Sequence, residues 1–226
     1  MMSETSIIKE KILHKGAEAY LYLGTWFGKK VIFKQRIPKR YRTIELDYQI
    51  RSKRTINEAR ALIKAKNYGI NVPVVYEIDP NTATIVMQYI EGEKLKDLMT
   101  KMNEEKKIEI FRTLGKYIAI LHDNGHIHGD ITTSNIIVTR NQNIVLIDFG
   151  LHENSETIED KSVDLHLFKR VLISSHGEDY KICYEAFLEG YISQYDDDKK
   201  NLCEEIIENI NIVESRGRYV KQEDRK

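Results

Sequence analysis

One stretch constrains this chain more than any other: residues 126–150, which read HIHGDITTSNIIVTRNQNIVLIDFG. Two short apolar runs in it, 136–138 and 144–147, are rich in the β-branched residues that strands favour. The polar segment between them, Arg140-Asn141-Gln142-Asn143, is of a length that joins antiparallel strands. The stretch therefore predicts a β-hairpin with a polar cluster at each outer end.

The polar clusters beside this hairpin carry oxygen-bearing side chains. Because a hairpin brings its two ends together, Asp130 and Asn135 before the first strand are expected to converge with Asp148 after the second. Three such groups at one point suit Mg²⁺, a hard cation that takes few carboxylates and leaves room for phosphate oxygens. This arrangement predicts a phosphoryl-transfer site.

Each tripeptide in the stretch also has an ordinary explanation, since a lone His-Gly-Asp or Asp-Phe-Gly is a common turn signal. Their conjunction is more specific. Asp130 and Asn135 have the spacing of the protein-kinase catalytic loop H-R-D-x-x-x-x-N, and the Asp-Phe-Gly follows across a hairpin as it does in kinases. We therefore expect a kinase-like site.

Composition sets the class of protein. With 41% hydrophobic and 31% charged residues in 226, the chain predicts a globular protein of one or two domains. Its 35 basic and 35 acidic residues cancel, so the whole-chain charge gives no argument for nucleic-acid binding, although it is compatible with a local basic patch. Cys183 and Cys203 lie outside any metal-ligand spacing and are expected to be buried thiols. No apolar window is long enough for a signal peptide or a membrane span, which predicts a cytoplasmic protein.

The N-terminal part predicts an antiparallel meander. The chain has three β-prone runs, at 7–13, 19–24 and 30–35. Turns at 15–18 and 25–28 separate them. Lys34 follows Val31-Ile32-Phe33 as the lysine of the kinase V-A-I-K motif follows its apolar residues, and it would supply a point charge to nucleotide phosphates. The alternatives are a charge on an edge strand for Lys34 and a plain hairpin for the first turn.

A helix is expected over residues 43–67. Its apolar stripe would comprise Ile56, Ala59 and Ile63. Glu58 borders this stripe and can lean toward the sheet to pair with Lys34, as the glutamate of the kinase αC helix does. The alternative is an i,i+4 pair with Arg54 on a solvated face.

The remainder completes an α+β fold. Two further strands are expected at 71–76 and 84–87, then helices at 95–99, 104–122, 163–174, 179–195 and 199–212, with a polar stretch at 151–161 and a charged, frayed tail from Glu214. Residues 1–89 would form an N-lobe, an antiparallel sheet with one helix, and residues 90–226 a mainly helical C-lobe. The predicted architecture is a minimal two-lobed, protein-kinase-like fold.

Four motifs carry a family resemblance: HGDITTSN, GAEA in place of a glycine-rich loop, Ile56-Asn57-Glu58-Ala59-Arg60, and Arg216-Gly217-Arg218. Together they resemble the small atypical kinase subunit of the KEOPS complex, whose eukaryotic relatives are the TP53-regulating kinases. The resemblance implies ATP and Mg²⁺ binding, serine/threonine autophosphorylation or ATPase activity, and service to the complex that makes threonylcarbamoyladenosine in tRNA. It implies two partners, a carbamoyl-transferring subunit and a small regulatory subunit, with tRNA met indirectly through the complex.

The resemblance also implies residue roles. Asp130 would be the catalytic aspartate, and Asn135 and Asp148 would hold the metal. Asp164 resembles the helix aspartate that anchors the catalytic-loop backbone, a charge at a helix start being the alternative. Met87 falls at the gatekeeper position, with Gln88 and Ile90 at the hinge. The nucleotide-binding residues carried over are Gly16, Ala17, Glu18, Ala19, Lys34, Glu58, Met87, Gln88 and Ile90.

Departures from ordinary protein kinases narrow the function. Gly129 replaces the arginine of H-R-D and no A-P-E follows the Asp-Phe-Gly, so neither activation-loop phosphorylation nor a peptide platform is expected. Rival functions are a small-molecule kinase of the aminoglycoside or choline type, for which roughly 135 residues after the hinge leave little room, and a RIO-type kinase of ribosome maturation, which carries an extra helical domain. A third rival is a nucleotide-bound scaffold, which would have no need of Asp130.

Overall fold

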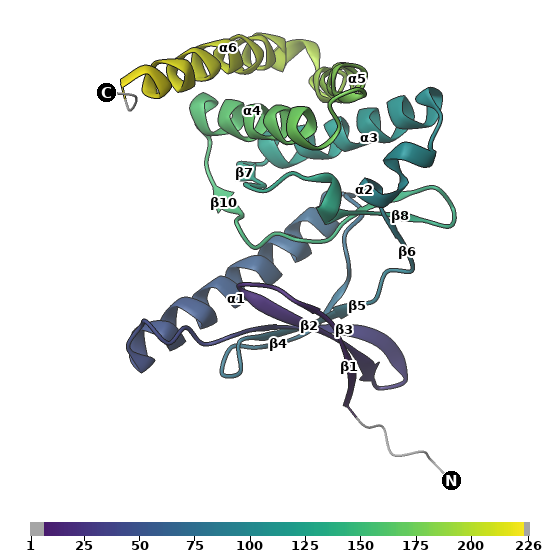
Figure 1. Ribbon diagram of the computed structural model, residues 1–226, viewed down its shortest axis with the longest axis vertical. Helices are drawn as coiled ribbons and strands as arrows, with labels where there is room; N and C mark the ends of the chain where they lie inside the picture. The colour runs from purple at the N-terminus through teal and green to yellow at the C-terminus, as the bar shows by residue number, and fades with distance from the viewer. Residues whose placement is uncertain (1–6, 224–226) are drawn as a thin grey trace. The chain divides into compact units, whose positions relative to one another are not determined.

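The computed structural model describes residues 7–223, with side chains up to Arg216 (Figure 1). The chain forms two compact units: Met1–Glu91 with Val145–Gly150, and Gly92–Ile144 with Leu151–Lys226. The first unit contains a five-stranded sheet and one long helix, and the second is mainly helical. The predicted α+β, kinase-like class is confirmed.

The sheet of the first unit is antiparallel throughout, in the order β1-β2-β3-β5-β4. Its strands are β1 Ile8–Lys15, β2 Ala19–Trp26, β3 Lys29–Arg36, β4 Val75–Asp79 and β5 Thr84–Gln88. The predicted meander is confirmed, but the turn expected at 25–28 is narrower. Phe27 and Gly28 alone make it, with φ angles of 46° and 76°, because Trp26 already pairs with Lys29.

The fourth strand lies further along the chain than expected. It begins at Val75 and not at Asn71, since Pro73 has no N–H to give to a ladder. The segment before it still makes single contacts. The Asn71 carbonyl accepts from Leu146 N at 2.9 Å, and the Val74 carbonyl accepts from Gln88 N at 2.8 Å.

The long helix α1 Ile44–Asn67 has the predicted extent and is capped by Thr43, whose hydroxyl accepts from Leu46 N. The predicted stripe was partly wrong, because Ile63 is 42% exposed. The buried face instead comprises Thr55, Glu58, Ala59, Ala61, Leu62 and Ala65, as well as Asp47 near the helix start. The helix is thus rotated so that Glu58 faces inward.

The predicted hairpin is present, its strands being β8 Ile136–Thr139 and β9 Ile144–Leu146, of which only Ile144 in β9 belongs to the second unit. The other elements of the second unit are β6 Gly92–Lys94, α2 Leu95–Leu98, η1 Met99–Lys101, α3 Glu104–Asp123, β7 His126–Ile127, η2 Thr133–Asn135, β10 Glu153–Asn154, α4 Ile158–Ser175, α5 Tyr180–Ile192, η3 Asp197–Lys199 and α6 Lys200–Glu223. Strands β6, β8 and β9 form one sheet in that order. Thr139 N donates to the Asn143 carbonyl at 2.9 Å and Gln142 takes a φ of 63°, which closes the turn. From Val145 the chain belongs to the first unit.

The core of the second unit is built where α3 and α5 cross at close range. A Cβ added to Gly115 would lie 1.9 Å from the Phe187 carbonyl oxygen, and one added to Gly190 would lie 1.9 Å from that of Arg112. Only glycine therefore permits this approach at either position. Both cysteines are buried free thiols, Cys183 in α5 and Cys203 in α6, as predicted.

Several helix ends in this unit differ from those expected, and α5, for example, ends at Ile192 and not at Tyr195. Helix α4 begins at Ile158, because the Thr157 hydroxyl accepts from Asp160 N at 3.1 Å and caps it, so only residues 151–157 separate it from the Asp-Phe-Gly. Helix α6 continues to Glu223, beyond Ile212, where the helix was expected to end. Glu214 accepts from Lys169 at 2.9 Å. Side chains from Gly217 on, including Arg218, and residues 224–226 lie outside the described part.

None of the helices between residues 7 and 223 has the length and hydrophobicity that crossing a membrane requires.

Candidate active site

Lys34 stands on β3, between β2 and β5, so the edge-strand explanation for its charge is wrong. Its side chain is buried, and its Nζ lies 2.5 Å from Glu58 Oε1 and 2.8 Å from Asp148 Oδ1. Burial alone would lower the pKa of Lys34, but the two carboxylates outweigh it and raise the pKa above its usual value. A fixed ammonium charge therefore stands between two carboxylates.

Glu58 is held by a second cation that the sequence analysis missed. Its Oε2 accepts from Arg36 Nη2 at 2.7 Å, and both side chains are buried. Arg36 follows Lys34 by two residues, so both point from the same face of β3, and that spacing could have predicted the contact. The alternative partner for Glu58 is excluded, because Arg54 pairs with Glu18 at 3.2 Å.

Asp148 follows β9 and belongs to the same unit as Lys34. Its side chain is 39% exposed, and its Oδ1 accepts from Gly150 N at 2.9 Å as well as from Lys34. A Cβ at Gly150 would lie 3.0 Å from that oxygen, which favours glycine there. The carboxylate is thus oriented by a local turn and partly open, as a metal ligand needs to be.

The turn between β1 and β2 is closed by Gly16 N, which donates to the Ala19 carbonyl at 3.0 Å. Two basic residues, Lys39 and Arg54, stabilise this turn through contacts that the sequence analysis did not predict. Lys39 Nζ donates to the Ala17 carbonyl at 2.5 Å, and Glu18 pairs with Lys39 at 3.6 Å and with Arg54 on α1. The acidic side chain in a turn predicted to meet phosphates is thereby neutralised.

One backbone group of the predicted hinge is already engaged within the sheet, and the hinge assignment stays a prediction. Met87 is buried on β5, but Gln88 N donates to the Val74 carbonyl at 2.8 Å, so this N–H is already used within the sheet. The Gln88 side-chain oxygen also accepts from Val74 N at 3.3 Å. Ile90, two residues beyond the end of β5, stays a prediction as an adenine contact.

In the second unit the structure brings the two predicted catalytic-loop residues together. Asn135 Nδ2 donates to Asp130 Oδ2 at 2.8 Å and to the Asp130 carbonyl at 3.0 Å. The Asp130 side chain stands at an exposed position, and Asn135 ends the short helix η2. The amide thus fixes a carboxylate that remains accessible to a reacting group.

Asp164 on α4 anchors the backbone of this loop. It is 2% exposed and accepts from His128 N and Gly129 N, each at 3.0 Å, and from His122 Nε2 at 3.1 Å. Burial opposes its ionisation, but these donors outweigh it and lower the pKa of Asp164. The helix-start alternative is wrong, because Asp164 lies more than one turn inside α4.

The backbone conformation at position 129 explains why glycine stands there in place of the kinase arginine. Its φ is 78°, and a Cβ there would lie 2.4 Å from the Leu151 carbonyl oxygen. A larger residue would have to push away the segment after the Asp-Phe-Gly.

Two further contacts, one to the loop and one to His122, support this arrangement, and no sequence signal predicted them. Thr133 Oγ1 lies 2.8 Å from His176 Nε2, just beyond the end of α4. Burial lowers the pKa of His176. His122, which contacts Asp164, has its Nδ1 2.9 Å from the Tyr191 hydroxyl, and that hydroxyl lies 2.9 Å from the Tyr195 hydroxyl.

The residues present fit Mg²⁺ and a nucleotide. Within the described part of the chain there is no cluster of three His, Cys, Asp or Glu side chains suited to a metal ion. An amide and one carboxylate do suit Mg²⁺ when phosphate oxygens complete its shell. Asn135 belongs to the second unit and Asp148 to the first, and their convergence stays a prediction.

Known proteins resemble this chain over most of its length. Residues 33–186 match the ABC1 atypical kinase-like domain family. The chain is 46% identical to KEOPS complex subunit Bud32 of Pyrococcus abyssi, covering 92% of this chain and 96% of that protein. It is 41% identical to a probable bifunctional tRNA threonylcarbamoyladenosine biosynthesis protein of Methanothermobacter thermautotrophicus, covering 92% of this chain and 36% of that protein. A Methanocaldococcus jannaschii protein of the same name is 40% identical, and the match covers 95% of this chain and 38% of that protein. The chain thus spans little more than a third of these bifunctional relatives.

Proposed function

This chain belongs to the family of KEOPS complex subunit Bud32 and contains an ABC1 atypical kinase-like domain, and from this premise we propose that it is a Mg-ATP-dependent atypical kinase or ATPase serving threonylcarbamoyladenosine formation in tRNA. The observation that carries the proposal is Lys34, a buried ammonium held at 2.5 Å by Glu58 and at 2.8 Å by Asp148. Such a cation beside a partly exposed carboxylate is suited to triphosphate and its metal.

In this proposal each site residue has a defined task. Mg-ATP, when bound, would supply the electrophilic γ-phosphoryl group and a cation that offsets its negative charge. Lys34 would bind the α- and β-phosphates, with Glu58 fixing its position. Asp148 and Asn135 would hold the cation. Asp130, oriented by Asn135, positions the attacking water or hydroxyl and accepts its proton.

Hydrolysis suits this chain better than phosphorylation of many peptides. A general protein kinase needs a docking platform after its Asp-Phe-Gly, and here residues 151–157 are all that precede α4. Gly129 also lacks the arginine that reads a phosphorylated loop. Water needs no platform, only an aligned γ-phosphate. Autophosphorylation of a serine or threonine in the same chain is the second activity that this site permits.

The bifunctional relatives support a physical partnership. In them a segment like this chain makes up little more than a third of a longer protein named for tRNA threonylcarbamoyladenosine biosynthesis. We propose that this chain works beside a carbamoyl-transferring subunit, with a small regulatory subunit as second partner, and that it is cytoplasmic. The family match argues against the RIO-type and aminoglycoside-type alternatives.

The test is phosphate release from Mg-ATP with and without the carbamoyl-transferring subunit, alongside label transfer to a peptide panel. The proposal expects hydrolysis to rise several-fold with the partner while peptide labelling stays slight. Efficient peptide labelling by the isolated chain, with no partner effect on hydrolysis, would identify a conventional protein kinase instead. No turnover in either setting would favour the scaffold.

A further inference from the structure

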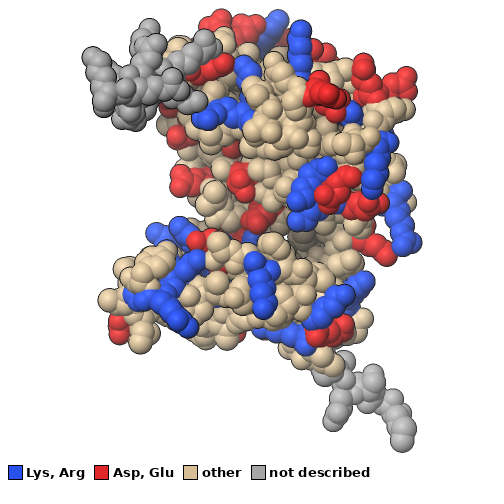
Figure 2. Space-filling model, viewed as in Figure 1, with Lys and Arg blue, Asp and Glu red and all other residues tan. Residues whose placement is uncertain are grey.

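The zero net charge of this chain conceals a strong asymmetry. Residues 1–91 contain 16 Lys and Arg against 9 Asp and Glu, whereas residues 92–226 contain 19 against 26. In Figure 2, Lys and Arg side chains outnumber Asp and Glu on the visible face of the first unit. Opposite charge in two parts of one chain is a signature of proteins that meet a polyanion through one part.

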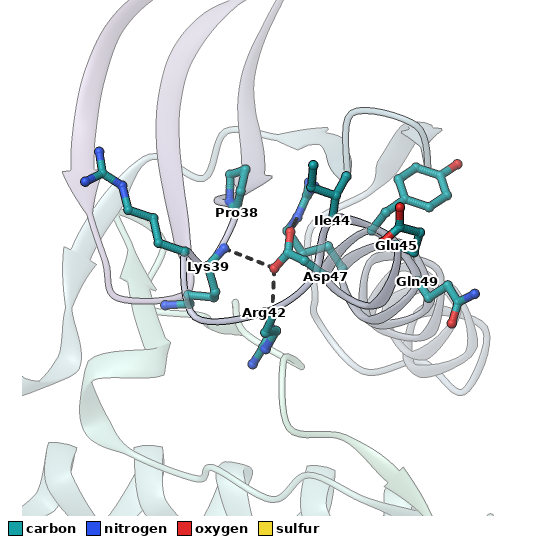
Figure 3. A pocket seen from close by; sticks show the side chains of 10 residues that line it. Pro38, Lys39, Arg42, Ile44, Glu45, Asp47 and Gln49 are labelled. Atoms are coloured by element: carbon teal, nitrogen blue, oxygen red, sulfur yellow. Dashed lines mark hydrogen bonds and ion pairs between the residues drawn. The ribbon is translucent and has the colours of Figure 1, made fainter.

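A hollow of about 850 Å³ lies where the chain enters α1 (Figure 3). Four cationic side chains line it, together with apolar groups and two carboxylates: Lys39, Arg40, Arg42, Arg51, Pro38, Ile44, Tyr48, Gln49, Glu45 and Asp47. We call this surface, with the adjoining Tyr41, the arginine hollow. It lies wholly within the first unit.

One buried carboxylate organises the cations of the arginine hollow. Asp47 is 3% exposed and accepts from Arg51 Nε at 2.6 Å and from Lys39 N at 3.0 Å, and Arg42 Nη1 lies 3.7 Å away. The negative charge is therefore buried, and the Arg42 and Arg51 side chains beside it are each 16% exposed. Arg42 Nη2 also donates to the Tyr41 hydroxyl at 3.1 Å. Arg40 is exposed and has no hydrogen-bond or ion-pair partner among the described residues. An outside anion would supply its partner.

Aromatic and apolar surface stands beside these cations. Tyr41 is 76% exposed, and the Arg42 guanidinium carbon lies 5.1 Å from its ring centroid. Ile44, at the start of α1, is 84% exposed. Arginines that bind phosphate next to an aromatic ring that accepts an unstacked base are the elements of a surface that binds RNA.

We infer that the arginine hollow binds tRNA directly, with Arg40 and Arg42 on backbone phosphates and an unstacked base against Tyr41. This inference rests on the proposed role in tRNA modification and extends it, since the chain would then contact the substrate of the complex itself. The exposed Tyr41 ring beside Arg42 favours RNA over an acidic protein, because RNA offers an unstacked base as well as phosphate groups.

The experiment measures binding of an unmodified tRNA transcript to the full chain by fluorescence anisotropy, from about 50 to 200 mM salt. The test variant is Arg40→Gln/Arg42→Gln. The matched control is Arg60→Gln/Lys64→Gln, which removes the same charge from exposed positions further along α1. Arg60 follows Arg51 by nine residues, so it points from the opposite side of the helix. Circular dichroism confirms that every variant is folded.

The inference predicts that the test variant binds at least tenfold more weakly at the lower salt and that its slope of log affinity against log salt falls by about two. The control should change affinity less than threefold. Tyr41→Ala should weaken binding about tenfold with an unchanged slope, because a lost stacking contact releases no counterions. Arg40→Gln alone, which breaks no internal contact, should lose about one unit of slope.

Three results would overturn the inference: no measurable tRNA binding by the wild-type chain at the lower salt, equal losses in test and control variants, or unchanged tRNA binding with loss of a protein partner of the complex. The last would assign the hollow to a protein. ATP hydrolysis by Arg40→Gln, measured in parallel, should equal that of the wild type. Failure of RNA binding is thereby separated from failure of the proposed nucleotide chemistry.

Discussion

Arg36 Nη2 lies 2.7 Å from Glu58 Oε2, so the glutamate that holds Lys34 is itself held by a second buried cation. Lys34 and Arg36 together carry two positive charges, which Glu58 and Asp148 balance. If Asp148 turns to a metal ion, one positive charge is left over at Lys34, which is where the proposed function needs it for a phosphate. Arg36 therefore acts as a positioning residue for the ammonium.

We predict that Arg36→Met lowers kcat for ATP hydrolysis about tenfold and costs about 2 kcal/mol of unfolding free energy, because Glu58 loses one of two buried partners. Arg36→Lys should recover most of the stability but less of kcat, since an ammonium cannot reproduce the guanidinium geometry. Urea unfolding and steady-state turnover measure the two effects. An Arg36→Met enzyme with normal kcat would show that the contact is only structural.

Glu58→Ala should reduce turnover more than nucleotide binding. Glu58 orients Lys34 and is not expected to touch the nucleotide, so kcat should fall about a hundredfold while nucleotide affinity changes by less than about fivefold. Single-turnover rates and equilibrium titration separate the two quantities. Equal losses in both would place Glu58 in nucleotide binding itself.

Gly129→Ala should destabilise the chain more than Gly69→Ala. Both glycines have a positive φ, 78° and 83°, so both substitutions strain the backbone. Only at Gly129 would the new Cβ meet an atom within 3 Å, the Leu151 carbonyl oxygen, whereas nothing lies within 4 Å at Gly69. We expect a difference of about 1–3 kcal/mol in unfolding free energy. Equal costs would mean that the segment after the Asp-Phe-Gly yields freely.

Acid should loosen the catalytic loop through His176. Burial lowers the pKa of this histidine in the folded chain, so the folded state disfavours its proton. Its contribution to stability is therefore present above the unfolded pKa of about 6.5 and is lost as the pH falls toward the lower, folded pKa. Unfolding free energy measured between pH 7.5 and 5 should decline.

The decline should be smaller in His176→Gln, which has no proton to gain at that position. Protonation of His166, whose pKa is also lowered by burial, should cause part of the decline in unfolding free energy that remains in this variant. A His176→Gln curve parallel to that of the wild type would assign the acid effect to other groups.

The sequence predicted the elements whose signals are local. The spacing of Asp130 and Asn135 placed both in one loop, and the structure joins them by a hydrogen bond. The β-branched runs predicted the first three strands and the hairpin, and Thr43 marked the start of α1. Each of these depends on neighbours within a few residues.

What the sequence analysis missed depends on distant contacts. The pairing of Glu58 with Lys34 was predicted, but the exposed Ile63 and the second cation at Glu58, Arg36, were not. Hydrophobic periodicity alone cannot anticipate them, because Arg36 lies on β3. The His176 contact to Thr133 joins residues 43 positions apart, and no motif marks it. The arginine hollow was missed because whole-chain charge averages opposite halves to zero.

The central claim, that this site turns over Mg-ATP on a metal held by Asp148, is tested most directly by phosphate release from the Asp148→Ala variant beside the carbamoyl-transferring subunit. We predict that the rate of phosphate release falls at least about a hundredfold relative to the wild type, on the order of 3 kcal/mol in the activation barrier. Circular dichroism should show that the variant is still folded. Phosphate release close to the wild-type rate in a folded Asp148→Ala chain would contradict the metal assignment and the function built on it.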